Sequence, residues 1–448
     1  MANAHERGWL HGVGVFIASF TAFALPISTA ATSVGNALVL IGSLAILLGQ
    51  TQPDSGQRLR LSSTIFVLAL IGWVALSLLW TDAAQHDALK DLVKYGKLLV
   101  IPGMIVLLPR KRDALLALGC YAFAQAFVVL SSWLLYLGID LPWVPNGNRM
   151  TVAVVYTDYI SQSIMTATFA ALCWVLKGAA PGRFGPAVAV AIAVAALLDT
   201  LFLLPGRSGW VVAAVLLTMI VWWHLPRRLK AAALLAPVLL AGLLLVSDMG
   251  RERLSKVIDE TDRYVEQGAE QTSSGERLNF WHRSLTSIAK RPLIGSGVGS
   301  WQLRYYELEG GDPPEGTRNT RNPHNEYLLL GVQTGLVGVL LFVALLVAVW
   351  RDGRRFDTAT ARAVMLLTAS LAVGSLFNSA LFDGAKGRFF CIVAGLLFAW
   401  GVSARKPLHV SPQSPSSALN PRAGAQPRLQ RLGDLGSTAT QVAPAADA

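Results

Sequence analysis

Arg207 is the first residue whose type and surroundings point to chemistry. It lies in residues 204–209 (LPGRSG), a tight turn between two apolar segments. A guanidinium group binds a phosphate through two parallel hydrogen bonds, so an anion is the expected partner of an arginine fixed in such a turn. The alternative is an ordinary interfacial charge that orients its neighbours in a membrane. Ionisable groups at membrane depth usually mark the path of a ligand, which favours the first interpretation.

A second arginine, Arg277, is expected near the start of a helix. Residues 273–276 (SSGE) match the capping-box pattern, in which a serine and a glutamate three residues later satisfy the first backbone N–H groups. The pattern predicts a helix from there to about Lys290, ahead of Pro292. Arg277 falls in its first turn, where the helix dipole already favours anions. A solvated helix of mixed charge is the alternative.

His324 is the sharpest candidate for acid–base chemistry. It follows Pro323 and immediately precedes an apolar helix, with Asn325 and Glu326 beside it to orient the ring. With an ordinary pKa of about 6.5, an imidazole accepts a proton near neutral pH. A lone histidine is more often structural, but its position at a membrane face favours a general base.

The elements that must position these side chains are apolar. The chain has 448 residues, of which 53% are hydrophobic and only 15% charged. Its apolar residues fall in runs of roughly twenty, the length that crosses a bilayer core as a helix. The sequence predicts an all-α polytopic membrane protein with about twelve spans. They are placed at residues 12–31, 33–50, 62–80, 97–109, 113–137, 159–177, 186–204, 208–225, 230–247, 326–349, 362–382 and 387–404.

Basic residues predict how these spans are oriented. Alternate connections are rich in lysine and arginine, as in residues 110–112 (RKR), and are therefore expected in the cytoplasm together with both termini. Residues 1–247 would form spans one to nine, 248–325 a long helical periplasmic loop, and 326–405 the last three spans. Residues 406–448 are rich in Pro, Ser, Ala and Gln and are expected to be a disordered cytoplasmic tail. Residues 1–33 also resemble a signal peptide, so the first span is either retained or cleaved.

Composition also excludes several classes of function. The net charge of +11 is expected from cytoplasmic loops, so it does not indicate nucleic acid as a partner. The three cysteines lie in apolar runs and no metal-ligand spacing exists, so we expect no disulfide, no metal and no cofactor. A second rank of residues near the periplasmic face is expected to bind substrate. These are Arg149, Arg318, Arg321, Asn325, Asp383, Lys386 and Arg388.

Several of these segments together resemble a known family. Arg277 and Trp281 have three residues between them, and residues 292–297 (PLIGSG), 323–328 (PHNEYL) and 335–338 (GLVG) follow. This pattern resembles the bacterial O-antigen ligase family, part of a larger ligase and polymerase superfamily. The resemblance at motif level covers about residues 200–345.

The resemblance implies a metal-independent, inverting glycosyltransferase of the inner membrane, similar in fold to membrane-embedded GT-C-like enzymes. Its donor would be a polysaccharide on undecaprenyl pyrophosphate, and its acceptor a sugar hydroxyl of the lipid A–core, on the periplasmic side. Membrane lipids would surround it. Arg207 and Arg277 would stabilise the pyrophosphate, and His324 would be the general base.

Three alternatives remain open at this stage. An O-antigen polymerase uses the same donor on the same side of the membrane. A protein O-oligosaccharyltransferase transfers the glycan to protein, but such enzymes tend to carry a larger periplasmic C-terminal domain. A transporter of lipid-linked glycans is more distant, because transporters place charges within many spans.

Overall fold

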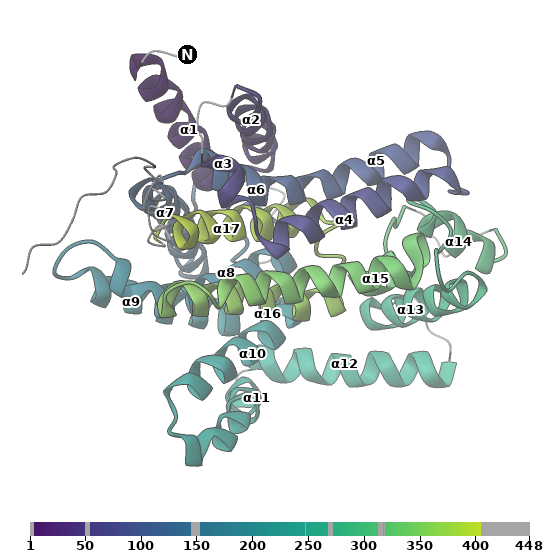
Figure 1. The fold of residues 1–448 in the computed structure, drawn as a ribbon. Coiled ribbons are helices and arrows are strands. Elements are labelled where there is room, and N and C mark those ends of the chain that lie inside the picture. The colour runs from purple at the N-terminus through teal and green to yellow at the C-terminus, as the bar shows by residue number, and fades with distance from the viewer. Residues whose placement is uncertain are drawn as a thin grey trace, which may run out of the picture. The chain divides into compact units, whose positions relative to one another are not determined.

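The computed structural model describes residues 4–49, 54–144, 153–246, 248–267, 272–311, 317 and 319–404. These residues form helices joined by short connections, with no strand among them (Figure 1). Residues 1–405 make up one compact unit. The predicted tail at 406–448 lies outside the described residues.

Ten of the described helices are long and apolar enough to cross a membrane. This confirms the prediction of an all-α polytopic membrane protein. The ten are α2 (Thr29–Leu48), α4 with η1 (Ser62–Leu79), α7 (Lys111–Tyr136), α8 with η4 (Tyr159–Ala179), α9 with η5 (Gly185–Leu203), α10 (Arg207–His224), η6 with α11 (Arg227–Val246), α15 (Glu326–Gly353), α16 (Thr358–Phe377) and α17 (Gly384–Ser403).

Two of the predicted spans are not among these ten helices. The first corresponds to α1 (Ala4–Ala24, 21 residues), whose apolar part is Gly8–Ala24. The predicted span 97–109 corresponds to α6 (Val100–Leu107), which has 8 residues. At 1.5 Å per residue such a helix rises roughly 12 Å, less than half of a bilayer core. Its apolar run is explained by burial, because all but one of its residues are buried inside the bundle.

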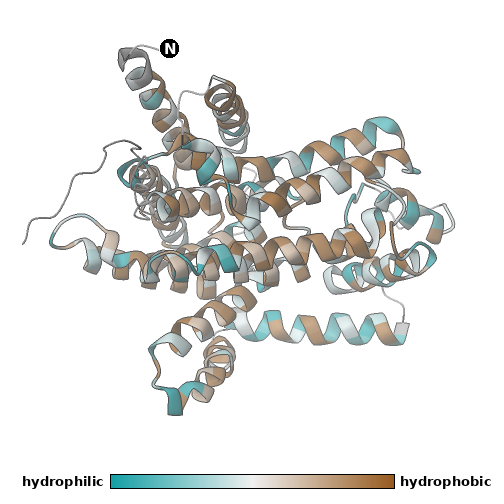
Figure 2. Ribbon diagram, in the orientation of Figure 1, coloured by the Kyte–Doolittle hydropathy of each residue, from teal (hydrophilic) through white to brown (hydrophobic). Residues whose placement is uncertain are grey.

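The hydrophilic helices gather between α11 and α15. They are α12 (Asp248–Gln267), α13 (Ser273–Lys290) and α14 (Trp301–Leu308), and Figure 2 shows more hydrophilic residues there than along the bundle. A further amphipathic helix, α5 (Gln85–Tyr95), continues through η2 (Gly96–Leu99) into α6. The helix predicted from the capping box is confirmed as α13. Its cap is Thr272 instead of Ser273, since the Thr272 hydroxyl accepts the N–H of Gly275 at 3.0 Å.

The connection between α13 and α14 is inserted into a break in α15. At Gly335 the backbone of α15 leaves the helical conformation (φ 67°, ψ −167°). This leaves backbone carbonyl and N–H groups on either side of Gly335 without partners inside the helix. The N–H of Ser296 donates to the Val332 carbonyl, and that of Leu336 to the Pro292 carbonyl, each at 2.8 Å. Residues 292–297 and 335–338, singled out by their glycines, therefore fix the loop to the membrane bundle.

The end of α4 clamps the same insertion from the other side. The indole N–H of Trp73 donates to the Thr334 carbonyl at 3.0 Å, and the Thr81 hydroxyl to the Val298 carbonyl at 2.7 Å. Gly297 (φ 88°) packs directly on the Thr81 backbone, leaving no room for a Cβ. The long loop is thus held to the membrane bundle at residues 292–298.

Candidate active site

Arg207 begins α10, next to the first turn of α8. Gly206 and Gly209 let the two helices approach, because a Cβ at either position would overlap the Ser163 side chain. The half-buried Arg207 guanidinium donates to the Ser274 hydroxyl at 3.2 Å. It also lies 3.5 Å from the Glu260 carboxylate of α12. The turn predicted from the sequence therefore aims its arginine at the long loop.

Glu260 makes a compact set of contacts at this point. One of its oxygens, Oε2, accepts the Ser274 hydroxyl at 2.6 Å and the Ser274 N–H at 3.2 Å, besides facing Arg207. Burial by itself raises the pKa of this carboxyl, but the Ser274 hydrogen bonds and the Arg207 charge outweigh it and lower the pKa. A serine hydroxyl, a helix N-terminal N–H and a guanidinium are also the groups that bind a phosphate oxygen.

Arg277 lies one helical turn beyond Ser274 on α13. Among the described residues its guanidinium makes no hydrogen bond and no ion pair. Burial lowers its pKa, and the positive charge of Arg207 lowers it further, while Tyr159, Glu260 and Glu276 act in the opposite direction. A largely buried guanidinium without a partner is unfavourable unless an anion joins it.

Arg207 and Arg277 both line a cavity of about 420 Å³ between α10, α11, α12 and α13. Ser208, Ser274 and Trp281 also line it, and the remaining wall is almost wholly apolar, with leucines from α11 and α12. A cavity with two cations and an otherwise apolar wall fits an amphiphile with an anionic head group better than a soluble sugar.

His324 adopts an unusual backbone conformation. Its φ of 52° is the one positive value of a non-glycine residue in the described part of the chain. Its N–H donates to the Asn322 side chain at 3.0 Å, and the Trp281 indole donates to the Pro323 carbonyl at 3.1 Å. Left-handed backbone at a non-glycine residue costs free energy and clusters at functional sites.

Burial, together with neighbouring charges, keeps the His324 imidazole neutral. Burial has the largest effect and lowers its pKa from 6.5 to about 4, and the nearby cations Arg277 and Lys386 contribute in the same direction. Asp383 and Asp158 oppose them. The expectation of an ordinary imidazole pKa was therefore wrong, because the ring is largely buried, with the Phe280 ring packed against it. A neutral imidazole is nevertheless the form that a general base needs.

Asn325 and Glu326 do not orient the imidazole. Asn325 caps α15, accepting the Leu328 N–H at 3.1 Å and donating to the Leu376 carbonyl at 3.0 Å. Glu326 is fully buried and accepts the backbone N–H of Leu381 at 2.9 Å. Its role is to hold the connection between α16 and α17 against the start of α15.

Asp383 and the buried Lys386 belong to a series of polar contacts at the start of α17. Lys386 lies 3.0 Å from the Asp383 carboxylate and donates to the Ser161 hydroxyl at 3.0 Å. Ser161 in turn donates to Asp158 at 2.6 Å. Burial raises the pKa of Asp383, but Lys386 outweighs it and lowers the pKa. The series joins α17 to α8 beside His324.

Sequence reasoning missed Asp158 and Ser161. Asp158 stands just before an apolar helix and does cap it, accepting the Ile160 and Ser161 N–H groups. A cap of this kind is a local signal, and nothing in it indicates Lys386, more than two hundred residues away. The starts of α8 and α17 are joined by the contact of Ser161 with Lys386.

The remaining residues that were expected to bind substrate do not contact His324 or lie outside the described residues. Arg388 donates to the Ser33 hydroxyl at 2.5 Å, near the start of α2. Arg321 forms an ion pair with Asp87, which ties the loop to α5. Arg149 and Arg318 lie outside the described residues. Within the described ranges, no group of three or more His, Cys, Asp or Glu is placed to hold a metal ion.

Comparison with known proteins places this site within one family model. Residues 191–343 match the O-antigen ligase family, a segment that contains Arg207, Arg277 and His324. An uncharacterized protein of Haemophilus influenzae is 25% identical over 164 residues, which is 35% of this chain and 40% of that protein. The match thus spans well under half of the relative's length.

Proposed function

Since residues 191–343 match the O-antigen ligase family, we propose that the chain is the ligase itself. It transfers a polysaccharide from undecaprenyl pyrophosphate to a sugar hydroxyl of the lipid A–core. The observation that carries this proposal is the apolar cavity with Arg207 and Arg277 in its wall. His324 does not line this cavity, but its charge environment includes Arg277, which does.

The cavity suits the head of a polyprenyl diphosphate. Arg277 has no anionic partner among the residues described, and an incoming diphosphate would supply one. The leucines of α11 and α12 would contact the first isoprene units, leaving the rest of the chain in the bilayer. As the anomeric bond breaks, negative charge develops on the departing diphosphate, and preorganised guanidinium groups stabilise it.

Glu260 occupies the position where we place a phosphate oxygen. Its Oε2 already accepts from Ser274 and faces Arg207. Donor binding would displace this carboxylate, since two anions cannot share the same donors without repulsion. In the empty enzyme Glu260 therefore keeps Arg207 oriented.

His324 would take the proton of the acceptor hydroxyl. The acceptor oxygen forms a bond to the anomeric carbon, the bond from that carbon to the diphosphate oxygen breaks, and the hydroxyl proton passes to the imidazole. This single displacement inverts the anomeric centre. The negative charge of a bound diphosphate beside Arg277 would also raise the pKa of His324, making it a stronger base in the complex.

The site is proposed to face the periplasm of the bacterial inner membrane. The basic connection before α7 and the one after α8 lie at the far end of α8 from Asp158. Cytoplasmic loops accumulate lysine and arginine, so that far end would be cytoplasmic.

The test is a reconstituted transfer reaction. Purified protein in liposomes receives undecaprenyl-pyrophosphate glycan and lipid A–core, and the products are separated by gel and mass spectrometry. We expect glycan on the core with wild type and none with His324→Ala, while exposed His282→Ala remains active. Longer glycan on undecaprenyl pyrophosphate would instead identify a polymerase. Glycan on added protein acceptor would identify a protein transferase, and movement of donor without transfer a transporter.

A further inference from the structure

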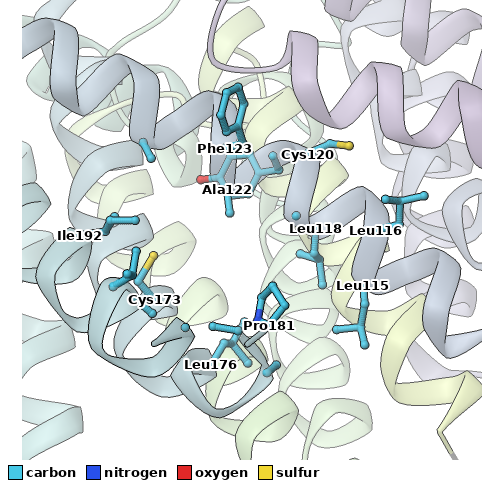
Figure 3. A pocket seen from close by; sticks show the side chains of 18 of the residues that line it. Leu115, Leu116, Leu118, Cys120, Ala122, Phe123, Cys173, Leu176, Pro181 and Ile192 are labelled. Atoms are coloured by element: carbon cyan, nitrogen blue, oxygen red, sulfur yellow. The ribbon is translucent and has the colours of Figure 1, made fainter. Parts of the chain in front are cut away.

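A second and larger cavity lies at the other end of the bundle from His324. Its volume is about 1180 Å³, and α7, α8 and α9 form most of its wall (Figure 3). Asp158 and Tyr159, beside the candidate site, begin α8, whereas Leu176 in the last turn of α8 lines this cavity. Seventeen residues of helix separate the two, a rise of roughly 25 Å.

The cavity exists because small residues face one another across it. Large side chains would close such a gap, but α7 presents glycine and alanine there and α9 does the same. These small residues are Gly119, Ala122, Ala126, Gly185 and Ala189. Leucine, isoleucine and cysteine side chains complete the wall, as Leu118, Leu176, Ile192, Cys120 and Cys173 do in Figure 3.

The cavity opens sideways, toward the surroundings of the bundle. Phe123 and Phe184 in its wall are each 69% exposed, and Val188 is 53% exposed. Exposed apolar side chains on membrane-spanning helices face the acyl chains of a bilayer. Protein interiors are close-packed, and water does not fill a cavity that offers it few polar partners. An acyl chain is therefore the natural occupant.

The mouth of the cavity carries cations without partners. Arg112 and Arg183 line it and are exposed, and neither makes a hydrogen bond or an ion pair with any residue that the structure describes. Arg183 lies over the Phe184 ring at 5.1 Å. Asp113, the carboxylate in the lining, has His11 at 3.3 Å. An anionic head group would complement the two guanidinium groups, which bind phosphate in a fork.

We propose that this cavity binds an anionic phospholipid, with an acyl chain between α7 and α9 and its phosphate held by Arg112 and Arg183. By the charge rule applied above, the lipid comes from the cytoplasmic leaflet. The site is separate from the proposed transfer site, because no residue lines both cavities. Lipid binding can therefore be measured whether or not the chain is a ligase.

The test uses photoactivatable lipids. The full chain is placed in phosphatidylcholine nanodiscs that contain a small fraction of either phosphatidylglycerol or phosphatidylcholine with a diazirine in the acyl chain. After irradiation, the labelled peptides are mapped by mass spectrometry. We expect phosphatidylglycerol to label the cavity-facing residues of α7 and α9 in preference to other lipid-facing helices.

Two sets of variants separate the head group from the acyl chain. Arg112→Gln with Arg183→Gln should lower labelling by phosphatidylglycerol about 25-fold, at roughly fivefold per arginine. The matched control, Arg227→Gln with Arg228→Gln, removes two exposed charges of η6 outside the cavity and should change nothing. Ala122→Trp should block the cavity for both lipids.

Several outcomes would overturn the proposal. Equal labelling by the two lipids, or unchanged labelling in the double arginine variant, would contradict the proposed head-group site. Labelling spread evenly over the lipid-facing helices would remove the cavity site altogether. The arginine variants change exposed side chains and keep the fold, so the test stands even if Ala122→Trp fails to fold.

Discussion

The pKa of His324 gives the sharpest prediction of how activity depends on pH. Burial, Arg277 and Lys386 lower it to about 4 against the opposing charges of Asp383 and Asp158. The imidazole is therefore neutral, and able to accept a proton, at every pH well above 4. Activity should be present above this pKa and be lost as the pH falls through it. The pH dependence of kcat/KM reports this pKa of the free enzyme.

The expected size of the effect follows from the two pKa values. At pH 5 an imidazole with a pKa of about 4 is roughly 90% neutral, whereas one at the ordinary 6.5 is about 3% neutral. At pH 5 the neutral fraction of the buried imidazole is thus roughly thirtyfold larger than that of an imidazole with the ordinary pKa. We expect kcat/KM at pH 5 to remain within about a factor of two of its value at pH 7.5.

The assay is the initial rate of transfer in liposomes at low donor concentration, measured from pH 4 to 8. His282→Ala, which removes an exposed imidazole of α13, is the matched control and should give the same profile. An acid limb with its midpoint between 6 and 7 in wild type would refute either the burial of the ring or its role as base. If the residual activity of His324→Ala showed the same pH profile as wild type, that result would refute the role of His324 as base but not the burial of its ring.

Four further predictions test other parts of the site. Arg277→Lys keeps a charge but loses the fork, so kcat should fall about a hundredfold in the transfer assay. Glu260→Gln should lower the donor KM about two- to fivefold, while Glu266→Gln, exposed on the same helix, should leave it unchanged. Gly297→Ala forces a Cβ onto the Thr81 backbone and should destabilise the protein by about 2 kcal/mol or more in a thermal unfolding assay. EDTA should leave transfer unchanged, and loss of activity restored by Mg²⁺ would contradict arginine-based stabilisation.

The membrane architecture was readable from the sequence because it depends on composition over long segments. Runs of apolar residues predict spans almost one by one, and ten of them are present as helices of sufficient length. The error at 97–109 has a physical cause. An apolar run indicates removal from water, and α6 achieves this by burial inside the bundle instead of by crossing it.

The candidate site was readable only in part. Arg207 stood out in a turn between apolar segments, Arg277 in the first turn of a capped helix, and His324 just before an apolar helix. In the structure Arg277 lies close enough to interact electrostatically with both Arg207 and His324. Glu260 and Asp158 did not stand out, since one lies in a strongly charged helix and the other resembles an ordinary cap. Their contacts depend on helix packing over long separations, which no local pattern encodes.

The insertion of residues 292–297 into the break of α15 has a consequence for biogenesis. The Thr81 hydroxyl donates a hydrogen bond to a carbonyl 217 positions later in the chain. The loop also needs α15 for its remaining backbone hydrogen bonds, so it cannot be fully packed until α15 has been made. A nascent chain in which α4 and α10 are already inserted therefore still lacks the part of the candidate active site that the loop supplies. The loop that carries Arg277 and His324 gains its contacts to α15 only when synthesis has passed Gly335, so truncated products should be inactive.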